Sequence, residues 1–184
     1  MKKIVIGIIA VVVLFVLYGF TTYNSLVTLN VSADAQWKQV EVNYQRRYDL
    51  IPNLVESVKG IMKQEQSIFI AIADARSHYA GATTPSDKAK AAGEVESALG
   101  RLLVITENYP QLKSSENVQD LMAELAGTEN RISQQRIRYN EDVKAYNLKV
   151  MTIPSSLIAH LTGFEVREYF NSVKEAATAP KVSL

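Results

Sequence analysis

The stretch Arg46-Arg47-Tyr48-Asp49-Leu50-Ile51-Pro52-Asn53-Leu54-Val55 places charges and a proline inside a region of helical apolar pattern. Proline has no N–H and its ring crowds the carbonyl four residues earlier, so Pro52 leaves the C=O of Tyr48 without its helical partner. We therefore expect a kink at Pro52 in a long first helix. The charges beside it need partners from the rest of the chain.

An apolar segment precedes this stretch. Residues 4–20 are seventeen uncharged residues, and the first charged residue after them is Asp34. At about 1.5 Å per residue, a helix of this length nearly spans a hydrocarbon core of about 30 Å. A cleavable signal peptide is the alternative, but no small-residue cleavage motif follows, and the run is longer than the usual apolar core of such peptides. We predict a signal anchor over residues 1–24 and one domain over residues 25–184.

The basic residues near the span predict its orientation. Lys2 and Lys3 precede it, whereas the first basic residue after it is Lys38. Lys and Arg are enriched on the cytoplasmic side of membrane spans, so the N-terminus is expected in the cytoplasm and the domain outside it.

Apolar residues keep a helical period from residue 25 to about residue 80, and several are eleven residues apart. Eleven residues make three turns of a nearly straight helix, so one long first helix is predicted over this range. We expect the later helices to leave its membrane-proximal stripe uncovered, and such a stripe marks contact with another chain or with lipid. Its residues, proposed for self-association, are Leu26, Leu29, Trp37, Val40, Tyr44 and Tyr48.

A second helix is predicted from Pro85, because Thr84 as N-cap and Asp87 three residues later form a start like a capping box. It ends before Tyr109-Pro110, because the residue before a proline avoids helical angles. The short loops at 81–85 and 109–114 indicate antiparallel packing of neighbouring helices.

A third helix is predicted from Ser114 or Ser115 to about Thr152. Its apolar seam repeats every seven residues, at Val118, Leu125, Ile132, Tyr139, Tyr146 and Ile153. A companion row becomes charged at Glu129 and Arg136. These two side chains either reach solvent or form a polar layer with the 46–55 stretch, because buried charges must be paired. The proposed structural polar layer comprises Arg46, Arg47, Asp49, Pro52, Asn53, Glu129, Arg136, Tyr139 and Asn140.

The pair Tyr139-Asn140 recurs seven residues later as Tyr146-Asn147, so both pairs share one helix face. Tyr and Asn side chains can orient a ligand in a cleft. We favour a structural interpretation, in which buried hydroxyls and amides satisfy one another and the backbone opened by Pro52.

Beyond Ile153-Pro154, residues 155–161 predict a short helix with Ser155 as N-cap and Gly163 just past its end. Residues 164–177 are compatible with a helix or an extended segment, and residues 179–184 indicate an extended end. The predicted fold class is all-α: a single N-terminal transmembrane helix running into a long antiparallel bundle, with a Pro-kinked first helix, a short C-terminal helix and an extended tail.

A series of motifs occurs in order along nearly the whole chain. It consists of the 46–55 stretch with residues 23–27, Trp37, Ala75-Arg76, 107–113, 128–132, 138–140, Tyr146-Asn147, Ile153-Pro154, Gly163-Phe164, Tyr169-Phe170 and 179–182. In these motifs the chain resembles the bacterial LemA family. The resemblance implies an inner-membrane protein with one N-terminal span and an antiparallel helical domain. It implies no enzymatic activity, because the family has no established one.

Composition and motifs exclude several kinds of site. The chain has no cysteine, which excludes disulfides, thiol catalysis and cysteine-ligated metal. A net charge of +1 without a basic groove argues against nucleic acid. His78 and His160 lack the pair or triad of ligands that a helical metal site needs, and there is no glycine-rich phosphate loop or G-x-S-x-G motif. We expect the protein to have no enzymatic activity and to bind no cofactor or metal.

Two functions remain. The first is a non-enzymatic membrane-anchored scaffold that self-associates and shapes or organises membrane, with lipid and further copies of the chain as partners. The alternative is a monomeric membrane-tethered binding module. It would recruit an envelope protein or a membrane protease through the 81–85 loop or the segment from Phe164.

Overall fold

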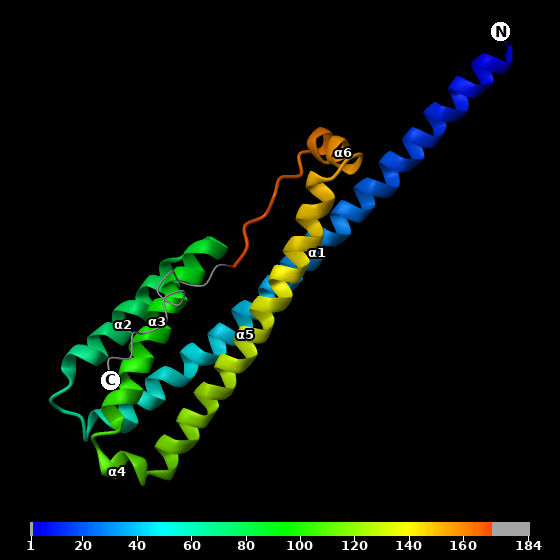
Figure 1. The fold of residues 1–184 in the computed structure, drawn as a ribbon. Helices are drawn as coiled ribbons and strands as arrows, with labels where there is room; N and C mark the ends of the chain where they lie inside the picture. Colours follow the sequence, from blue (N-terminus) through cyan, green and yellow to red (C-terminus); the bar gives the residue numbers. More distant parts are fainter. Residues whose placement is uncertain (1, 171–184) are drawn as a thin grey trace, which may run out of the picture. The chain divides into compact units, whose positions relative to one another are not determined.

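The computed structural model describes residues 2–170. Within this range six helices follow one another: α1 (Lys2–Lys59), α2 (Gln66–Gly81), α3 (Pro85–Thr106), α4 (Pro110–Lys113), α5 (Glu116–Met151) and α6 (Ser155–Thr162) (Figure 1). Residues 2–170 contain no strand, which confirms the all-α prediction. The extended end predicted for residues 179–184 lies outside the described residues.

The described residues divide into two compact units. One holds residues 2–38 and 137–169, and the other holds residues 39–136 and 170. Helices α1 and α5 are each divided between the two units, with one part in the first unit and the other part in the second.

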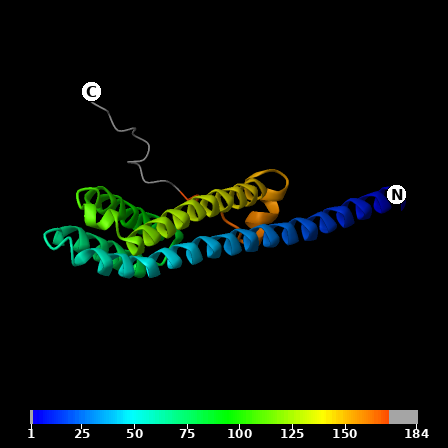
Figure 2. The same ribbon diagram turned by 90° about the horizontal axis from the view of Figure 1, so that it is seen from below.

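In the first unit, α1 and α5 pack antiparallel. The core joins Leu26 of α1 to Tyr146 and Val150 of α5, and further along α1 the ring of Trp37 lies 5.3 Å from that of Tyr139. Later residues of α1 thus contact earlier residues of α5, as expected for an antiparallel pair. Figures 1 and 2 both show this part of α5 beside α1.

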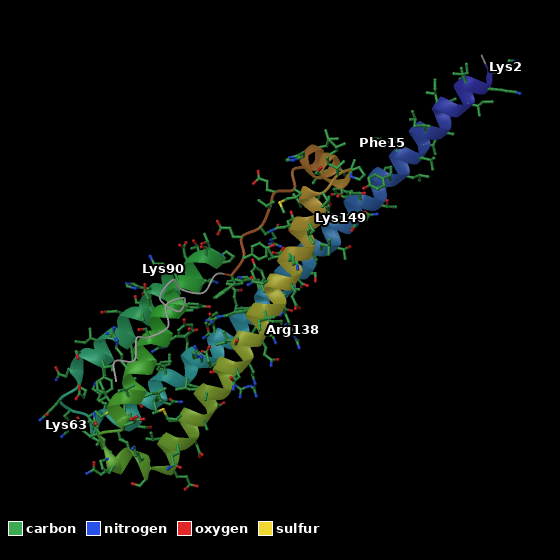
Figure 3. All side chains as sticks on the ribbon, viewed as in Figure 1. Lys2, Phe15, Lys63, Lys90, Arg138 and Lys149 are labelled. Atoms are coloured by element: carbon green, nitrogen blue, oxygen red, sulfur yellow. The ribbon has the colours of Figure 1, made fainter. Side chains whose placement is uncertain are left out.

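The N-terminal part of α1 has no protein cover. Its large aliphatic and Phe side chains from Ile4 to Phe20 are 48–68% exposed, and the first buried residue along the described chain is Thr22. Figure 3 shows the side chains between Lys2 and Phe15 projecting from a helix with no neighbour. Within residues 2–170, α1 is the one helix long and apolar enough to cross a membrane.

In the second unit, the C-terminal part of α1 contacts α2 through Tyr44 and Tyr79, and it contacts α3 and the N-terminal part of α5 through the ion pairs of Arg47, while α4 contacts α3. Helices α2 and α3 pack against each other as an antiparallel pair (Figure 1). Each helix supplies buried apolar side chains, and the unit's core includes Ile51, Leu54, Val58, Ile68, Ile72, Val95, Leu102, Leu112, Val118, Leu125 and Ile132.

The prediction of one helix from residue 25 to about residue 80 is wrong. Helix α1 ends at Lys59, and residues 60–65 form turns before α2 begins at Gln66. Glycine is a poor helix former, and Gly60 is followed by the polar run 63–66, so little holds the helix together there. Pro52 lies inside α1, which continues past it, and the kink expected at Pro52 stays a prediction.

The predicted start of α3 is confirmed. Thr84 has an extended conformation, and its Oγ1 accepts a hydrogen bond from the backbone N–H of Asp87 at 3.1 Å, while Pro85 opens the helix. The predicted stop is confirmed as well, because α3 ends at Thr106. The sequence pattern missed α4, a single turn that Pro110 begins.

Helix α5 matches the predicted third helix to within two residues at each end. The heptad seam is buried at Val118, Leu125, Ile132, Tyr139 and Tyr146. Its sixth member is a wrong prediction: Ile153 is 83% exposed, because α5 ends at Met151 and the seam ends with it.

The short helix α6 lies where the sequence predicts it, and Gly163 just past its end has a φ of 76°. The capping role given to Ser155 is wrong. Pro154 is the N-cap residue, and Ser155 is the first helical residue, whose Oγ donates to the carbonyl of Thr152 at 2.9 Å. The sequence is compatible with a helix or an extended segment over residues 164–177. Residues 164–170 are not helical, so the helix is excluded for that part.

Replacing Gly163 by Ala should lower the free energy of unfolding by about 1 kcal/mol, because a Cβ disfavours positive φ. The matched control is Gly127→Ala inside α5, where a Cβ meets no atom within 4 Å. That change should raise stability by about 0.5–1 kcal/mol. Thermal melts of the full chain in detergent, followed by circular dichroism, measure both. Equal effects of the same sign would contradict the expectation.

Candidate functional site

The most deeply buried charge among the described residues is Arg47, which α1 directs into the second unit with only 3% of its surface exposed. Its guanidinium pairs with the carboxylate of Glu129 on α5, and its Nη1 lies 3.5 Å from Oε1 of Glu96 on α3. Burying a lone charge in a protein interior costs several kcal/mol, so these carboxylates are required partners of Arg47.

A second arginine completes the cluster. Arg136 of α5 also pairs with Glu96, and its Nε donates to the hydroxyl of Tyr44 on α1 at 2.9 Å. Two guanidinium groups and two carboxylates thus balance in charge. Burial disfavours the charge of Arg136, but Tyr44 and Glu96 outweigh this and raise its pKa above the ordinary value. The cluster joins α1, α3 and α5.

Several residues of the proposed polar layer lie outside this cluster. Arg46 is exposed and pairs with Glu124 at 2.9 Å, and Asp49 is exposed and accepts a hydrogen bond from Gln45 at 2.8 Å. Pro52 is half-buried and Asn53 is exposed. The two adjacent arginines therefore point to different environments, because a turn of about 100° separates consecutive helical residues.

Glu96 is not among the residues predicted for the polar layer. The residue lies four positions after Ala92 and three before Leu99, both of which are buried on the packed face of α3. Residues with these spacings share a helix face, so a carboxylate at this position is a signal for a buried partner of opposite charge. Tyr44 had been assigned to the self-association stripe rather than to this layer.

Tyr139 and Asn140 belong to the first unit, where the Tyr-Asn face holds an extended segment of the chain. The hydroxyls of Tyr139 and Tyr146 donate to the carbonyls of Glu168 and Glu165 at 3.3 and 2.9 Å. The Asn147 amide bonds Arg167 in both directions, donating to its C=O at 2.9 Å and accepting from its N–H at 2.8 Å.

The partner predicted for the Tyr-Asn pairs is thus wrong in part. The hydrogen bonds are structural, but they satisfy the backbone of residues 165–168 and not the carbonyl opened by Pro52. An extended segment without a neighbouring strand leaves its backbone groups unpaired, and the α5 side chains take the place of that strand. Asn140 is half-buried on the same helix.

The expectation of an uncovered apolar stripe on α1 is wrong. Five of its six residues are buried within the chain and Leu29 is partly buried against the core. The cause is the length of α5, whose C-terminal part reaches back along α1 and covers Leu26 and Trp37. The buried residues are Leu26, Trp37, Val40, Tyr44 and Tyr48.

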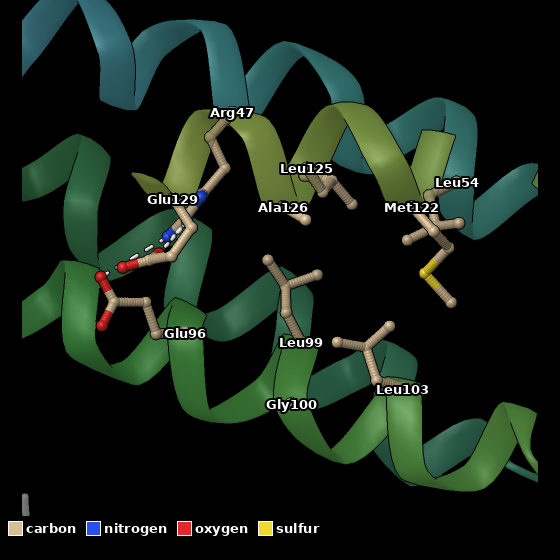
Figure 4. Close-up of a pocket in the computed structure, with 10 residues that line it drawn as sticks. All are labelled: Arg47, Leu54, Glu96, Leu99, Gly100, Leu103, Met122, Leu125, Ala126 and Glu129. Atoms are coloured by element: carbon tan, nitrogen blue, oxygen red, sulfur yellow. Dashed lines mark hydrogen bonds and ion pairs between the residues drawn. The ribbon is translucent and has the colours of Figure 1, made fainter. Parts of the chain in front are cut away.

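A cavity of about 400 Å³ lies beside the ion cluster in the second unit (Figure 4). Arg47, Glu96 and Glu129 gather at one end, and the remaining wall is apolar. That wall is formed by Leu54, Leu99, Gly100, Leu103, Met122, Leu125 and Ala126. Nε of Arg47 is buried and has no hydrogen-bond partner among residues 2–170.

Three tyrosines from α1 and α2 pack together next to the cluster. The Tyr79 ring lies 4.3 Å from that of Tyr48 and 5.4 Å from that of Tyr44. Burial raises the pKa of Tyr44 to about 12, although the Arg136 guanidinium opposes the shift. Burial and the neighbouring tyrosines also raise the pKa values of Tyr48 and Tyr79. All three hydroxyls therefore stay neutral at physiological pH. The Tyr44 hydroxyl accepts from Arg136, whereas that of Tyr48 is buried and has no hydrogen-bond partner among residues 2–170.

The histidines lie apart from the cluster. Nδ1 of His78 contacts Oε2 of Glu94 at 2.7 Å on the surface, and His160 is exposed on α6. Residues 2–170 hold no group of three or more His, Cys, Asp or Glu side chains placed to share a metal ion.

The LemA family model matches residues 36–184. The chain belongs to the LemA family. This membership agrees with the all-helical fold and with the resemblance found in the sequence. Together with the apolar segment of α1, it makes the chain a membrane-associated helical protein.

Curated relatives of this LemA-family chain include magnetosome proteins. It is 30% identical over 198 residues to magnetosome protein MamQ 2 of Paramagnetospirillum magneticum, covering 94% of this chain and 72% of that protein. It is 31% identical over 187 residues to magnetosome protein MamQ of Magnetospirillum gryphiswaldense, covering 88% of this chain and 68% of that protein.

We expect Glu129→Gln to destabilise the LemA-family chain by about 2–3 kcal/mol, because it leaves the buried Arg47 charge with only the longer contact to Glu96. The cost stays below that of a fully buried pair, since the Glu129 side chain is 41% exposed. The matched control is Glu124→Gln on the same helix, whose partner Arg46 is exposed; it should cost less than about 1 kcal/mol. Denaturant titration of the full chain measures both, and equal costs would show that the Arg47 pair is not structural.

The stability of the chain should also fall as the pH rises from about 10 to about 12. Below the ordinary tyrosine pKa the folded and unfolded states both keep the Tyr44 proton; above it the unfolded state releases the proton while the folded state retains it. The contribution of Tyr44 that is lost by about pH 12 is about 2–3 kcal/mol. The difference in unfolding free energy between wild type and Tyr44→Phe isolates it, since other groups titrate in both proteins. A pH-independent difference would refute the buried position of the hydroxyl.

Proposed function

We propose that this chain is a non-enzymatic scaffold, anchored in the inner membrane by residues 4–20, that self-associates and organises the membrane around it. The observation that carries the proposal is the continuity of α1. The helix passes from a segment without protein cover into a packed core at Thr22 and Leu26, with no loop between them. A rigid connection of this kind transmits the orientation of a folded unit to the bilayer, which a flexible linker would not do.

The chemistry of the cluster supports a structural rather than a catalytic role. Its carboxylates are paired with guanidinium groups, and its tyrosine hydroxyl accepts from Arg136. The relatives are named as magnetosome proteins, and we propose a comparable role at a membrane for this chain. By the charge rule, Lys2 and Lys3 favour an N-terminus in the cytoplasm, with the folded part outside it.

We propose a self-association surface other than the α1 stripe, because the chain itself covers that stripe. Apolar side chains of the first unit that remain exposed outside the span include Val31 on α1 and Ile137 and Leu148 on α5. Ile137 and Leu148 are eleven residues apart on one side of α5, so they form one face. The span and this face are the proposed contacts between copies.

The binding-module alternative is favoured by one observation, the apolar cavity of about 400 Å³ beside Arg47. A concave apolar site with a few polar groups at one end has the form of many ligand or peptide sites. The segment after Phe164 supports this alternative less well, because Tyr139, Tyr146 and Asn147 already bind residues 165–168.

Particle size separates the two functions. The full chain in mild detergent should form particles larger than a monomer, and a chain starting at Ser25 should form smaller ones, because it lacks the span. Light scattering and negative-stain electron microscopy measure both. Ile137→Glu should reduce the particle size, whereas Val104→Glu, an exposed valine of α3, is the matched control. A uniform monomer of the full chain in both detergent and lipid would refute self-association and favour the binding module.

A further inference from the structure

We propose that α6 and the turn before it form a second membrane contact, lying on the bilayer surface next to the span. The inference rests on the anchoring of residues 4–20, which is part of the proposed function. It assigns a lipid-binding surface to residues that the scaffold proposal does not use.

The position of α6 follows from its contacts with α1. A Cβ atom placed on Gly19 would lie 3.7 Å from Cδ1 of Ile158. Ala159 belongs to the core cluster with Leu26, and the ring of Phe164 just after α6 lies 5.8 Å from the ring of Tyr23. These contacts fix α6 beside residues 19–26 of α1, where the apolar segment without protein cover ends.

The length of the span places that level at the membrane surface. Residues 4–20 cover about 26 Å at about 1.5 Å per residue, close to the thickness of a hydrocarbon core. With these residues in the bilayer, positions 19–26 lie at the headgroup region. Tyr23, 43% exposed, is the type of side chain that membrane interfaces favour. Helix α6 therefore lies at the height of the headgroups.

Helix α6 exposes two leucines together with the uncharged or weakly basic residues Thr162 and His160. Ile158 and Ala159 are buried against the core, whereas Leu157 is 54% exposed and Leu161 is 81% exposed. Leu157 and Leu161 are four residues apart, so they lie on one helix face. Ile153, in the turn before α6, is exposed as well. An exposed apolar group of this size on one short segment indicates contact with an apolar phase.

The charge pattern favours lipid as that phase. Residues 150–164 contain no Asp, Glu, Lys or Arg, and Lys149 and Glu165 flank them. Figure 3 shows Lys149 near the end of α5, next to the turn that leads into α6. An uncharged apolar segment can enter the headgroup and acyl boundary without desolvating a charge, and basic side chains beside it are attracted to anionic lipids. His160 is the one titratable side chain within the segment.

The test uses single cysteines in the full chain, which has no native cysteine. Leu161→Cys and Leu157→Cys are labelled with an environment-sensitive fluorophore and reconstituted in vesicles of phosphatidylethanolamine and phosphatidylglycerol. The label should emit at shorter wavelength in vesicles than in water, and lipids with a nitroxide near the headgroup should quench it more than lipids with a nitroxide near the chain end. The matched control is Val104→Cys on α3, which is as exposed as these leucines; its label should be quenched by aqueous iodide and not by nitroxide lipids.

Three outcomes are informative. Lipid quenching at residues 157 and 161 but not at 104 supports the proposal. Emission at shorter wavelength without lipid quenching would show that another copy of the chain covers α6, and it would overturn the proposal. The proposal would also be overturned if iodide quenched the labels at residues 157 and 161 as readily as the control label. Vesicle flotation of the same samples would then show whether the chain is still anchored in the membrane. Particle size reports on the scaffold separately.

Discussion

The buried charge of Arg47 is the constraint on which the second unit depends. A guanidinium almost fully removed from solvent needs carboxylates at defined positions, and here they come from two different helices, Glu129 on α5 and Glu96 on α3. Glu96 also pairs with Arg136, so one misplacement of α3 along its axis would unpair two arginines. Apolar packing alone tolerates such shifts more easily, because leucines can exchange neighbours. The cluster therefore acts on the register of the helices more than on their total stability.

A second constraint acts in the first unit, where the chain after α6 is extended but has no strand beside it. The Tyr146 hydroxyl and the Asn147 amide supply hydrogen bonds to its backbone, and the Arg167 side chain bonds the carbonyl of Asn30 at 2.8 Å. The heptad spacing of the Tyr-Asn pairs is what puts these groups in one row along α5. The repeat in the sequence thus corresponds to a repeated contact with one segment, and not to a cleft for a ligand.

The start of the packed part of α1 links the folded unit to the apolar segment before it. Thr22 is the first buried residue of α1, and residues 19–26 receive Ile158, Ala159 and Phe164 from the C-terminal part of the chain. The described chain thus returns to the end of the apolar segment of α1. In the proposed function, a folded unit held in this way acts on the bilayer, and the exposed leucines of α6 are the proposed surface of contact.

The sequence by itself determined the all-α fold, the apolar segment of α1, the start of α3 and the extents of α5 and α6. These features depend on local properties: charge-free length, the Thr84-Pro85-Asp87 cap, heptad spacing and the position of Gly163. The apolar periodicity also predicted a first helix that continues past Gly60, which is wrong. Periodicity continues on both sides of a turn, so it does not show where the chain reverses. Which residues meet was decided only by the tertiary structure. The partner of Arg47 depends on three helices far apart in the sequence, and the α1 stripe is covered because α5 is long enough to return along it. A pattern shows that a side chain needs a partner, but only the path of the chain decides which partner it has.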